Sequence, residues 1–491
     1  MLENINPNQE MDKKTYKAEL RSLETTLAAL QQRVIEERLP IVIVFEGWGG
    51  SGKGTCISRL VNPLDPRYFD VRISGKLTED KLMRPFLWSF WTYLPPKGQI
   101  VIMDKSWHRL MLPNVRDSWQ LSNMETHGFT YDVNAFERKL TEAGYIIIKF
   151  FLHISKEEQE KRFDKLSENP STSWRVEPHD REQNKNYNQH MRHFEKMLRL
   201  TNTDVNPWNI IEADNKRFAA CKIMRIIAEN LERRLDEKEA EVEAEPEKPE
   251  KVKVPLILSK IQPDETIEND EYKLALKEYQ GRIRLLGNKM YAKRRSVVIV
   301  YEGWDAAGKG GNIKRLTSEM DPRGYAVVPI AAPNPHELSR HYLWRFMVKM
   351  PKDGHLTIFD RSWYGRVLVE RVEGLTPEPI WRRSYGEIND MEQHLVGHGT
   401  IILKFWLHID KEEQLRRFES RKNDPLKQHK ITEEDWRNRE KWDLYEAAVD
   451  EMLHRTHNSY APWIIVESNC KKYARIKVLQ TVTDALEDAL R

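Results

Sequence analysis

The chain has 491 residues, a length that allows two or three domains. Its 79 lysines and arginines nearly balance 76 aspartates and glutamates, so a general polycation for nucleic acid is not expected and any polyanion site must be local. No apolar run approaches the roughly 18 residues of a membrane-spanning helix, and the segment MLENINPNQEMDKK lacks the apolar core of a signal peptide. Three scattered cysteines, Cys56, Cys221 and Cys470, are typical of reduced thiols, so we expect a cytoplasmic protein without a membrane partner.

The chain consists of two copies of one unit. Three segments recur at a nearly constant offset: residues 16–34 as 272–290, residues 42–48 as 298–304, and residues 148–154 as 403–409. The first pair has apolar residues spaced by three and four and predicts an amphipathic helix, while the other two pairs are apolar runs. Because a repeat this long is a whole domain, it indicates duplication and fusion rather than a solenoid.

A polar stretch separates the copies. Residues 232–254 include EKEAEVEAEPEKPEKVKV, a run of Glu, Lys and Pro that cannot bury enough apolar surface to fold alone. We predict a linker here, the first part of which is compatible with an extension of the preceding helix. The predicted domains are therefore residues 1–231 and residues 255–491.

Each copy is predicted to be an α/β domain of the P-loop kinase type. In the second copy the apolar runs are Ser296–Glu302, Ala326–Ile330, His355–Phe359, Thr400–Ile409 and Trp463–Glu467, and helical patterns separate them. Near-continuous apolar strands between helices are typical of a parallel sheet covered on both faces. Because such sheets bind ligands at the carboxyl ends of their strands, we expect the functional site after Tyr301 and after Phe359.

A glycine-rich loop follows the first of these strands. The spacing Gly303-x-x-x-x-Gly308-Lys309, after a strand and before a helix, is that of a phosphate-binding P-loop. We expect Lys309 and loop N–H groups to hold phosphates, assisted by the positive end of the following helix. The predicted backbone ligands are Gly303, Ala306, Ala307, Gly308 and Gly310.

Two aspartates are the predicted metal ligands. The Ser or Thr that usually follows the P-loop lysine and binds Mg²⁺ is replaced by Gly310, and Asp305 inside the loop is the nearest substitute. Asp360 ends a later apolar strand, in the Walker B position of a P-loop unit. Since Mg²⁺ accepts one or two carboxylates with phosphate oxygens and water, we predict that Asp305 and Asp360 share it. Arg361 and Arg366, which follow, suit bidentate phosphate contacts.

A basic segment in residues 414–443 is the predicted lid. Its predicted phosphate ligands are Arg417, Arg421, Lys427 and Lys430. In a phosphotransferase such a helical segment closes over the phosphates and excludes water. A solvated charged helix is the alternative, and the P-loop in the same unit favours the lid.

These motifs resemble the polyphosphate kinase 2 family. The similar segments are EGWDAAGKGG in residues 302–311, FDRSWYGRVLVERVEG in residues 359–374 and the lid motif Asp424-Pro425-x-Lys427. The resemblance covers nearly the whole chain in two copies, like the fused two-domain members of that family. It implies transfer of the terminal phosphoryl group of inorganic polyphosphate to AMP, which gives ADP, with Mg²⁺ as the metal.

The resemblance also implies roles for individual residues. Asp305 and Asp360 would hold the metal and position the acceptor phosphate, and Arg361 and the lid would hold polyphosphate. The predicted catalytic groups are Asp305, Asp360, Arg361 and Lys309 of the P-loop.

The two copies are not equally equipped. The first copy keeps Gly47, Gly52, Lys53 and Asp104. Five residues of the second copy, Asp305, Arg361, Arg366, Arg421 and Lys427, correspond to Gly49, Lys105, Leu110, Leu166 and Thr172. Phosphoryl transfer depends on positioning and charge stabilisation, so we predict that the second copy catalyses and that the first is structural or binds polyphosphate weakly.

Two other functions fit the same motifs. An ATP-dependent nucleoside monophosphate kinase would have a similar P-loop sheet and lid, and a non-catalytic protein that binds polyanions would use the same cations without needing Asp305. Residue spacing leaves open the choice among nucleoside mono- and diphosphates as acceptors. It also leaves open the oligomeric state, for which a homo-oligomer is one option.

Overall fold

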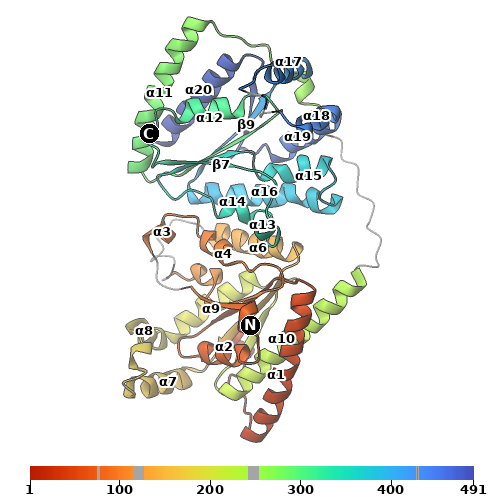
Figure 1. The fold of residues 1–491 in the computed structure, drawn as a ribbon. Coiled ribbons are helices and arrows are strands. Elements are labelled where there is room, and N and C mark those ends of the chain that lie inside the picture. The colour runs from red at the N-terminus through yellow and green to blue at the C-terminus, as the bar shows by residue number, and fades with distance from the viewer. Residues whose placement is uncertain (75–77, 114, 116–125, 242–253, 427, 429–430) are drawn as a thin grey trace. The chain divides into compact units, whose positions relative to one another are not determined.

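Each half of the chain folds around its own five-stranded parallel sheet (Figure 1). The computed structural model describes residues 1–491 except 75–77, 114, 116–125, 242–253, 427, 429 and 430. One compact unit contains most of residues 1–247 and the other contains most of residues 248–491. The predicted α/β class is confirmed in both units.

The first half of the chain alternates strands with helices. Its strands are β1 (Ile41–Gly47), β2 (Phe69–Ile73), β3 (Ile100–Asp104), β4 (Ile146–His153) and β5 (Trp208–Glu212). Its α-helices among the described residues are α1 (Lys13–Glu36), α2 (Lys53–Val61), α3 (Glu79–Leu82), α4 (Trp88–Tyr93), α6 (Thr126–Glu142), α7 (Lys156–Glu168), α8 (Pro178–Lys185), α9 (Tyr187–Thr201) and α10 (Lys216–Glu241).

The second half repeats this order. Its strands are β6 (Val297–Gly303), β7 (Tyr325–Pro329), β8 (Leu356–Asp360), β9 (Ile401–His408) and β10 (Trp463–Glu467). Its α-helices among the described residues are α11 (Asn269–Ala292), α12 (Lys309–Thr317), α13 (Pro335–Leu338), α14 (Trp344–Met347), α15 (Val369–Val372), α16 (Glu378–His398), α17 (Lys411–Lys422), α18 (Glu433–Glu440), α19 (Trp442–Thr456) and α20 (Lys471–Ala489). The five predicted strands match these bounds to within one residue at each end.

The two sheets have the same strand order. It is β2-β3-β1-β4-β5 in the first unit and β7-β8-β6-β9-β10 in the second. All neighbouring strands are parallel, and β6 lies between β8 and β9. Tyr301 near the end of β6 is opposite Asp360 at the end of β8, so the loop after β6 begins beside Asp360.

Helices cover both faces of each sheet. In the second unit α12 and α20 pack on one face and α16 packs on the other (Figure 1). The interior of β6 has no accessible surface at Val298, Ile299 and Val300. The predicted amphipathic helices are confirmed as α1 and α11, which pack on α10 and α20.

A buried ion pair fixes the turn after β8. On β9, Lys404 Nζ donates to Glu392 of α16 at 2.8 Å and to the Thr456 carbonyl at 2.7 Å. Trp363 Nε1 and the Tyr364 hydroxyl, both in η6 (Trp363–Arg366), donate to the same Glu392 carboxylate. Removing one partner of such a network leaves an uncompensated buried charge, so these contacts stabilise the chain directly after β8.

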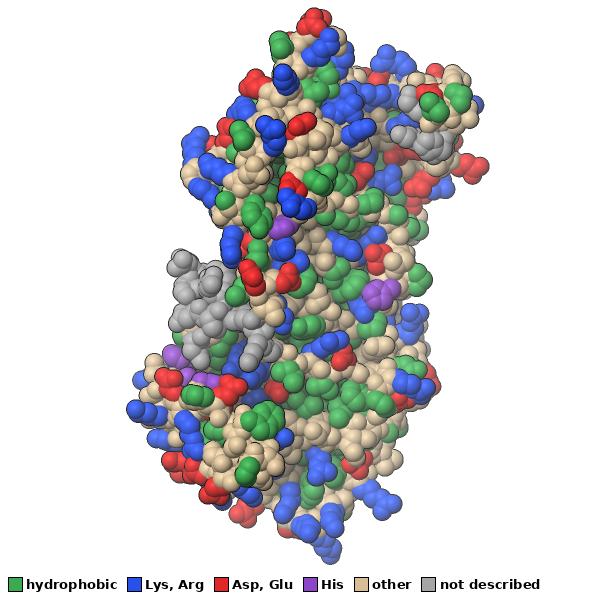
Figure 2. All heavy atoms as spheres, turned by 60° about the vertical axis from the view of Figure 1, so that its left-hand side comes forward, with side chains coloured by type: hydrophobic (Ala, Val, Ile, Leu, Met, Phe, Trp, Pro, Cys, Tyr) green, Lys and Arg blue, Asp and Glu red, His purple; other side chains and the backbone are tan. Residues whose placement is uncertain are grey.

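Helix α10 continues to Glu241, so the first part of the predicted linker, residues 232–241, is helical. The rest of that prediction falls largely on residues 242–253, which lie outside the described residues. No helix in the described part of the chain is long and apolar enough to cross a membrane. Basic and acidic side chains are interspersed on the face shown in Figure 2, in keeping with the nearly balanced charge.

Candidate active site

The loop after β6 has the backbone of a phosphate cradle. Gly303 has a φ of 145°, and a Cβ there would lie 2.5 Å from the Leu407 carbonyl oxygen, so only glycine fits. Ala306 has a φ of 62°, an uncommon value for a residue with a side chain. Gly308 caps α12 in the left-handed conformation, with a φ of 112°. The loop therefore turns sharply, and its N–H groups lie beside the N-terminus of α12.

A cavity of about 690 Å³ opens over this loop. Most of the residues predicted from the sequence line it: Asp305, Ala306, Ala307, Gly308, Lys309, Gly310, Asp360, Arg361 and Arg421. Lys314 and Arg315 of α12 add two cations that sequence reasoning missed. The predicted ligands Lys427 and Lys430 lie outside the described residues.

Lys309 lies at the base of the loop. Its Nζ donates to the Gly303 carbonyl at 2.7 Å and to the Trp304 carbonyl at 3.3 Å. Burial lowers the pKa of Lys309, while the carboxylates of Asp305 and Asp360 act in the opposite direction. The lysine is thus oriented by loop carbonyls and faces the two aspartates that share its cavity.

Asp305 is held between two donors. One carboxylate oxygen lies 3.2 Å from Arg361 Nη2, and the other accepts a hydrogen bond from Asn438 Nδ2 of α18 at 3.0 Å. Gln414 of α17 donates to the Asp305 backbone carbonyl at 3.2 Å. Sequence reasoning missed Gln414 and Asn438. Their counterparts Gln159 and Gln183 recur at the same offset as the lid, a signal that could have found them.

Arg361 directly follows β8 in the left-handed conformation, with a φ of 64°. Its N–H donates to the Tyr301 carbonyl at 3.0 Å, which joins the turn to the neighbouring strand. Burial alone would lower the pKa of Arg361, but Asp305 and then Glu302 outweigh it and raise the pKa. The guanidinium therefore stays charged over the cavity beside Asp305.

The two aspartates suit a metal that the substrate helps to bind. Among the described residues, no group of three or more His, Cys, Asp and Glu side chains is placed to hold a metal ion. Asp305 and Asp360 instead present two carboxylates to one cavity over the loop. That donor set fits Mg²⁺, which takes few protein carboxylates and completes its shell with phosphate oxygens and water.

Two arginines lie differently from the prediction. Arg417 is 5% exposed, and its guanidinium donates to the carbonyls of Ala306, Ala307, Ser468 and Asn469 at 2.6–3.0 Å. It supports the loop from behind and has no such donor left for phosphate. Burial, with Arg416 and Arg421 nearby, lowers the pKa of Arg417 to about 10.

Arg366 points away from the cavity. Its Nη1 lies 2.7 Å from Glu370 and 2.7 Å from the Thr376 hydroxyl, and its guanidinium stacks on the Tyr342 ring. Direct phosphate contact by Arg366 and Arg417 therefore does not follow from this geometry. Both were predicted from charge and proximity in sequence, which do not show where a guanidinium points.

A smaller cavity of about 90 Å³ adjoins the first. The two cavities share Asp305, Arg361, Glu434 and Asn438. Beyond these polar groups the smaller cavity is lined mainly by apolar and aromatic side chains, namely Trp304, Leu368, Val369, Trp406, Tyr445 and Val449. Apolar and aromatic side chains combined with a few polar groups are typical of the lining of a site for a small organic ligand.

The corresponding loop of the first unit has its space filled. The Gly49 N–H donates to Gln183 Oε1 of α8 at 2.9 Å. A Cβ at Gly49 would lie 2.5 Å from Asp180 Oδ1, so the counterpart of Asp305 does not fit there. Burial lowers the pKa of Lys53 to about 8, with Asp104 opposing it. The first unit thus keeps the loop, and the side chains of Asp180 and Gln183 occupy the space beside Gly49.

Comparisons with known proteins point to one family. The family model described as polyphosphate kinase 2 matches residues 10–239 and again residues 266–491. A polyphosphate:AMP phosphotransferase of Pseudomonas aeruginosa is 40% identical over 500 residues, covering 100% of this chain and 99% of the relative. One of Acinetobacter johnsonii is 35% identical, covering 95% of this chain and 94% of the relative. A crystal structure assigned to polyphosphate kinase 2 from Pseudomonas aeruginosa superposes with a TM-score of 0.87 at 37% identity, covering 100% of this chain and 99% of that one.

Proposed function

Because this chain belongs to the polyphosphate kinase 2 family and is a phosphotransferase, we propose that it moves the terminal phosphoryl group of inorganic polyphosphate to AMP. We place the reaction in the second unit. The observation that carries this proposal is the cavity in which Asp305, Lys309, Asp360 and Arg361 meet over one phosphate loop. The full-length relatives named for the same reaction support the choice of donor and acceptor.

The proposed reaction is an in-line displacement. An oxygen of the AMP phosphate attacks the terminal phosphorus of polyphosphate, and the bond from that phosphorus to the bridging oxygen breaks. The shortened polyphosphate leaves with the electron pair, and ADP forms. The acceptor phosphate is already anionic at neutral pH, because the second pKa of a phosphate monoester is about 6, so a strong general base is not needed.

The main barrier is repulsion between two polyanions. Lys309 and Arg361 face the cavity and would stabilise the charge on the transferred group. Asp305 and Asp360 would hold Mg²⁺, which when bound would neutralise part of the phosphate charge. Arg417 would act as a positioning residue, because it binds the carbonyls of Ala306 and Ala307 in the loop whose N–H groups would face the phosphates.

The smaller cavity is the proposed acceptor site. It opens beside Asp305 and Arg361 and offers aromatic walls for a nucleoside, with Glu434 and Asn438 at its rim. This arrangement would put the AMP phosphate at the shared rim and the donor over the P-loop. In-line attack requires the two substrates to meet at such a boundary.

A donor assay on the full-length protein tests the proposal. With AMP as acceptor, polyphosphate as sole donor should yield ADP, whereas ATP as sole donor should yield much less. Turnover with ATP alone would favour a nucleoside monophosphate kinase. Binding of polyphosphate without any ADP formation would favour a non-catalytic polyanion-binding protein.

A further inference from the structure

Two successive hydrogen bonds connect the wall of the smaller cavity to Asp305. The Tyr445 hydroxyl on α19 donates to Asn438 Oδ1 of α18 at 3.2 Å. Asn438 Nδ2 in turn donates to an Asp305 carboxylate oxygen at 3.0 Å. All three residues line the smaller cavity, and Asp305 and Asn438 also line the larger one. A tyrosine in the wall of the proposed acceptor site is therefore linked to a carboxylate of the P-loop.

The two hydrogen bonds run in one direction. An ionised carboxylate only accepts hydrogen bonds, so the amide nitrogen of Asn438 must face Asp305. The amide oxygen is then left for the Tyr445 hydroxyl, which donates to it. Burial, with Glu373 and Asp305 nearby, raises the pKa of Tyr445, so the hydroxyl keeps its proton at neutral pH. The tyrosine thus holds the amide, and the amide fixes where the carboxylate points.

Glu373, which directly follows α15, anchors the segment that carries Tyr445. Its carboxylate lies 2.9 Å from Lys441 Nζ, at the junction of α18 and α19, and 3.6 Å from Arg437 Nε of α18. The Tyr445 hydroxyl lies 3.5 Å from the other carboxylate oxygen, farther than from Asn438. Because the hydroxyl has one hydrogen, the shorter contact to Asn438 is the stronger one.

The backbone of Asp305 is held separately from its side chain. Arg439 Nη1 of α18 donates to Gln414 Oε1 at 3.3 Å, and Gln414 Nε2 donates to the Asp305 carbonyl at 3.2 Å. These contacts do not involve Tyr445 or Asn438. Loss of the tyrosine hydroxyl should therefore leave the loop backbone in place and affect only the direction of the carboxylate.

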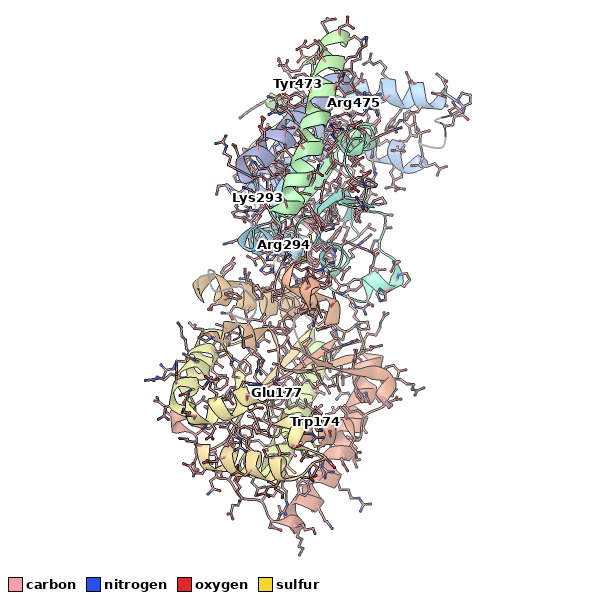
Figure 3. All side chains as sticks on the ribbon, turned by 90° about the vertical axis from the view of Figure 1, so that its left-hand side faces the viewer. Trp174, Glu177, Lys293, Arg294, Tyr473 and Arg475 are labelled. Atoms are coloured by element: carbon pink, nitrogen blue, oxygen red, sulfur yellow. The ribbon has the colours of Figure 1, made fainter. Side chains whose placement is uncertain are left out.

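The first unit provides a comparison for this arrangement. Its helices α7 and α8 correspond to α17 and α18, and the connection between them passes through Trp174 and Glu177 (Figure 3). In the first unit the ring of Tyr187 stacks on the loop tryptophan, with centroids 4.0 Å apart. Trp442 stacks in the same way in the second unit, at 3.7 Å. The correspondence drawn from the sequence therefore also holds in the structure of each unit.

All three hydrogen-bonding positions differ in the first unit. It carries Gly49, Gln183 and His190 where the second unit has the aspartate, the asparagine and the tyrosine. Gln183 accepts a hydrogen bond from the Gly49 N–H at 2.9 Å, and the His190 ring lies 6.1 Å from that of His193. The asparagine and the tyrosine thus accompany the aspartate, as expected of residues that serve its carboxylate.

We propose that Tyr445 is a positioning residue for phosphoryl transfer, which acts through Asn438 to hold the Asp305 carboxylate in its reactive direction. This inference rests on the proposed function. In this role the hydroxyl acts on Asp305 and not on either substrate. Its loss should therefore slow the transfer without weakening substrate binding, because a misplacement of about 1 Å is enough to slow a reaction strongly. The ring of Tyr445 separately forms part of the cavity wall.

Tyr445→Phe in the full-length protein removes the hydroxyl and keeps the ring. With AMP and polyphosphate, we expect kcat to fall about tenfold, the effect of one lost hydrogen bond, while both KM values change by less than about twofold. Tyr445→Ala should also raise the KM for AMP, because the ring is lost from the cavity wall. The matched control is Tyr460→Phe, which removes a hydroxyl that donates to the Asn389 carbonyl at 3.2 Å. Tyr460 is a described residue of the same unit that lines neither cavity, so kcat should not change.

A double substitution tests whether the tyrosine acts through the asparagine. Asn438→Leu removes the amide, so adding Tyr445→Phe to it should lower kcat no further, whereas independent effects would multiply. Melting temperatures of the parent protein and of each variant are measured alongside, and we expect Tyr445→Phe and Tyr460→Phe to shift them equally.

Three results would overturn the proposal. They are an unchanged kcat in Tyr445→Phe, a raised KM for AMP with kcat unchanged, which would assign the hydroxyl to acceptor binding, and effects that multiply in the double variant. Formation of no ADP from polyphosphate by the parent protein would instead refute the proposed function, and this inference with it.

Discussion

The two units share a loop scaffold and differ in what the loop presents. Arg162 in the first unit and Arg417 in the second each donate to two loop carbonyls and to two carbonyls after the last strand of their sheet. Lys53 and Lys309 likewise both donate to the carbonyls at the end of the central strand. These contacts involve backbone, so they are the same in both units although the side chains over the two loops differ. One loop scaffold can therefore carry different sets of charged side chains.

The largest expected effect is on turnover, and it is tested by replacing one corresponding carboxylate in each unit. Asp305→Asn should reduce turnover of AMP with polyphosphate by at least about 10³-fold, because a neutral amide cannot hold a cation between two polyanions. Asp104→Asn, at the position of the first unit that corresponds to Asp360, should leave most of the activity. Initial rates of ADP formation on the two purified variants, compared with the parent protein, measure the difference.

Both substitutions are nearly isosteric, so unchanged melting temperatures would show that the fold is kept. Near-normal turnover by Asp305→Asn would contradict the assignment of the second unit as catalytic. A comparable loss in both variants would show that the first unit also takes part.

Replacing Arg417, which supports the loop, should have a smaller effect on catalysis. Arg417→Met should lower kcat/KM by about 10²-fold, since displacement of a positioning element by about 1 Å has consequences of that size. Arg162→Met removes the same four carbonyl contacts in the first unit and should lower thermal stability with little change in kcat. Calorimetry and steady-state kinetics on the pair check this. Equal catalytic losses in the two variants would contradict a positioning role limited to the second unit.

The sequence predicted the fold well because its signals are local. Apolar runs and turn residues placed all five strands of the second unit to within one residue, and the glycine spacing located the loop. Side-chain direction is a different problem. Arg366 and Arg417 have the right charge in the right segments, yet packing against Tyr342 and against loop carbonyls turns their guanidinium groups to structural contacts.

The sequence also did not predict the contacts between distant segments. Asn438 and Gln414 approach Asp305 from helices more than a hundred residues away in sequence, and no local pattern links them. The sequence also did not predict that the space beside Gly49 is filled. In the sequence, glycine at this position indicates only that the aspartate is missing. The geometry shows that the side chains of Asp180 and Gln183 occupy the space of the missing side chain.

Because this space is filled, we predict that restoring the aspartate at position 49 does not by itself restore activity. Gly49→Asp, made in a chain that also carries Asp305→Asn, should restore no turnover, because the new Cβ would meet Asp180 at 2.5 Å. Overpacking and like charge together should lower stability by about 1–3 kcal/mol. Denaturant titration and an ADP assay are the measurements. Recovered activity would show that α8 yields readily and that the first unit is only one residue from catalysis.

The smallest expected effect concerns the backbone of the loop. Ala306 in the second unit and Gly50 in the first both have a φ near the left-handed region, at 62° and 68°. Glycine adopts this conformation without a steric penalty, whereas alanine does so at a cost of about 1 kcal/mol. Gly50→Ala should therefore destabilise the first unit by about 1 kcal/mol, and slightly more because its Cβ would lie 3.0 Å from the Phe163 ring. Ala306→Gly should change the stability of the second unit by less than that, since relief of strain is offset by added entropy of the unfolded chain.

If Ala306→Gly nevertheless lowers kcat, the strained alanine holds the loop N–H groups in their reactive arrangement. If kcat is unchanged, the scaffold formed by Arg417 and Lys309 is sufficient to hold them.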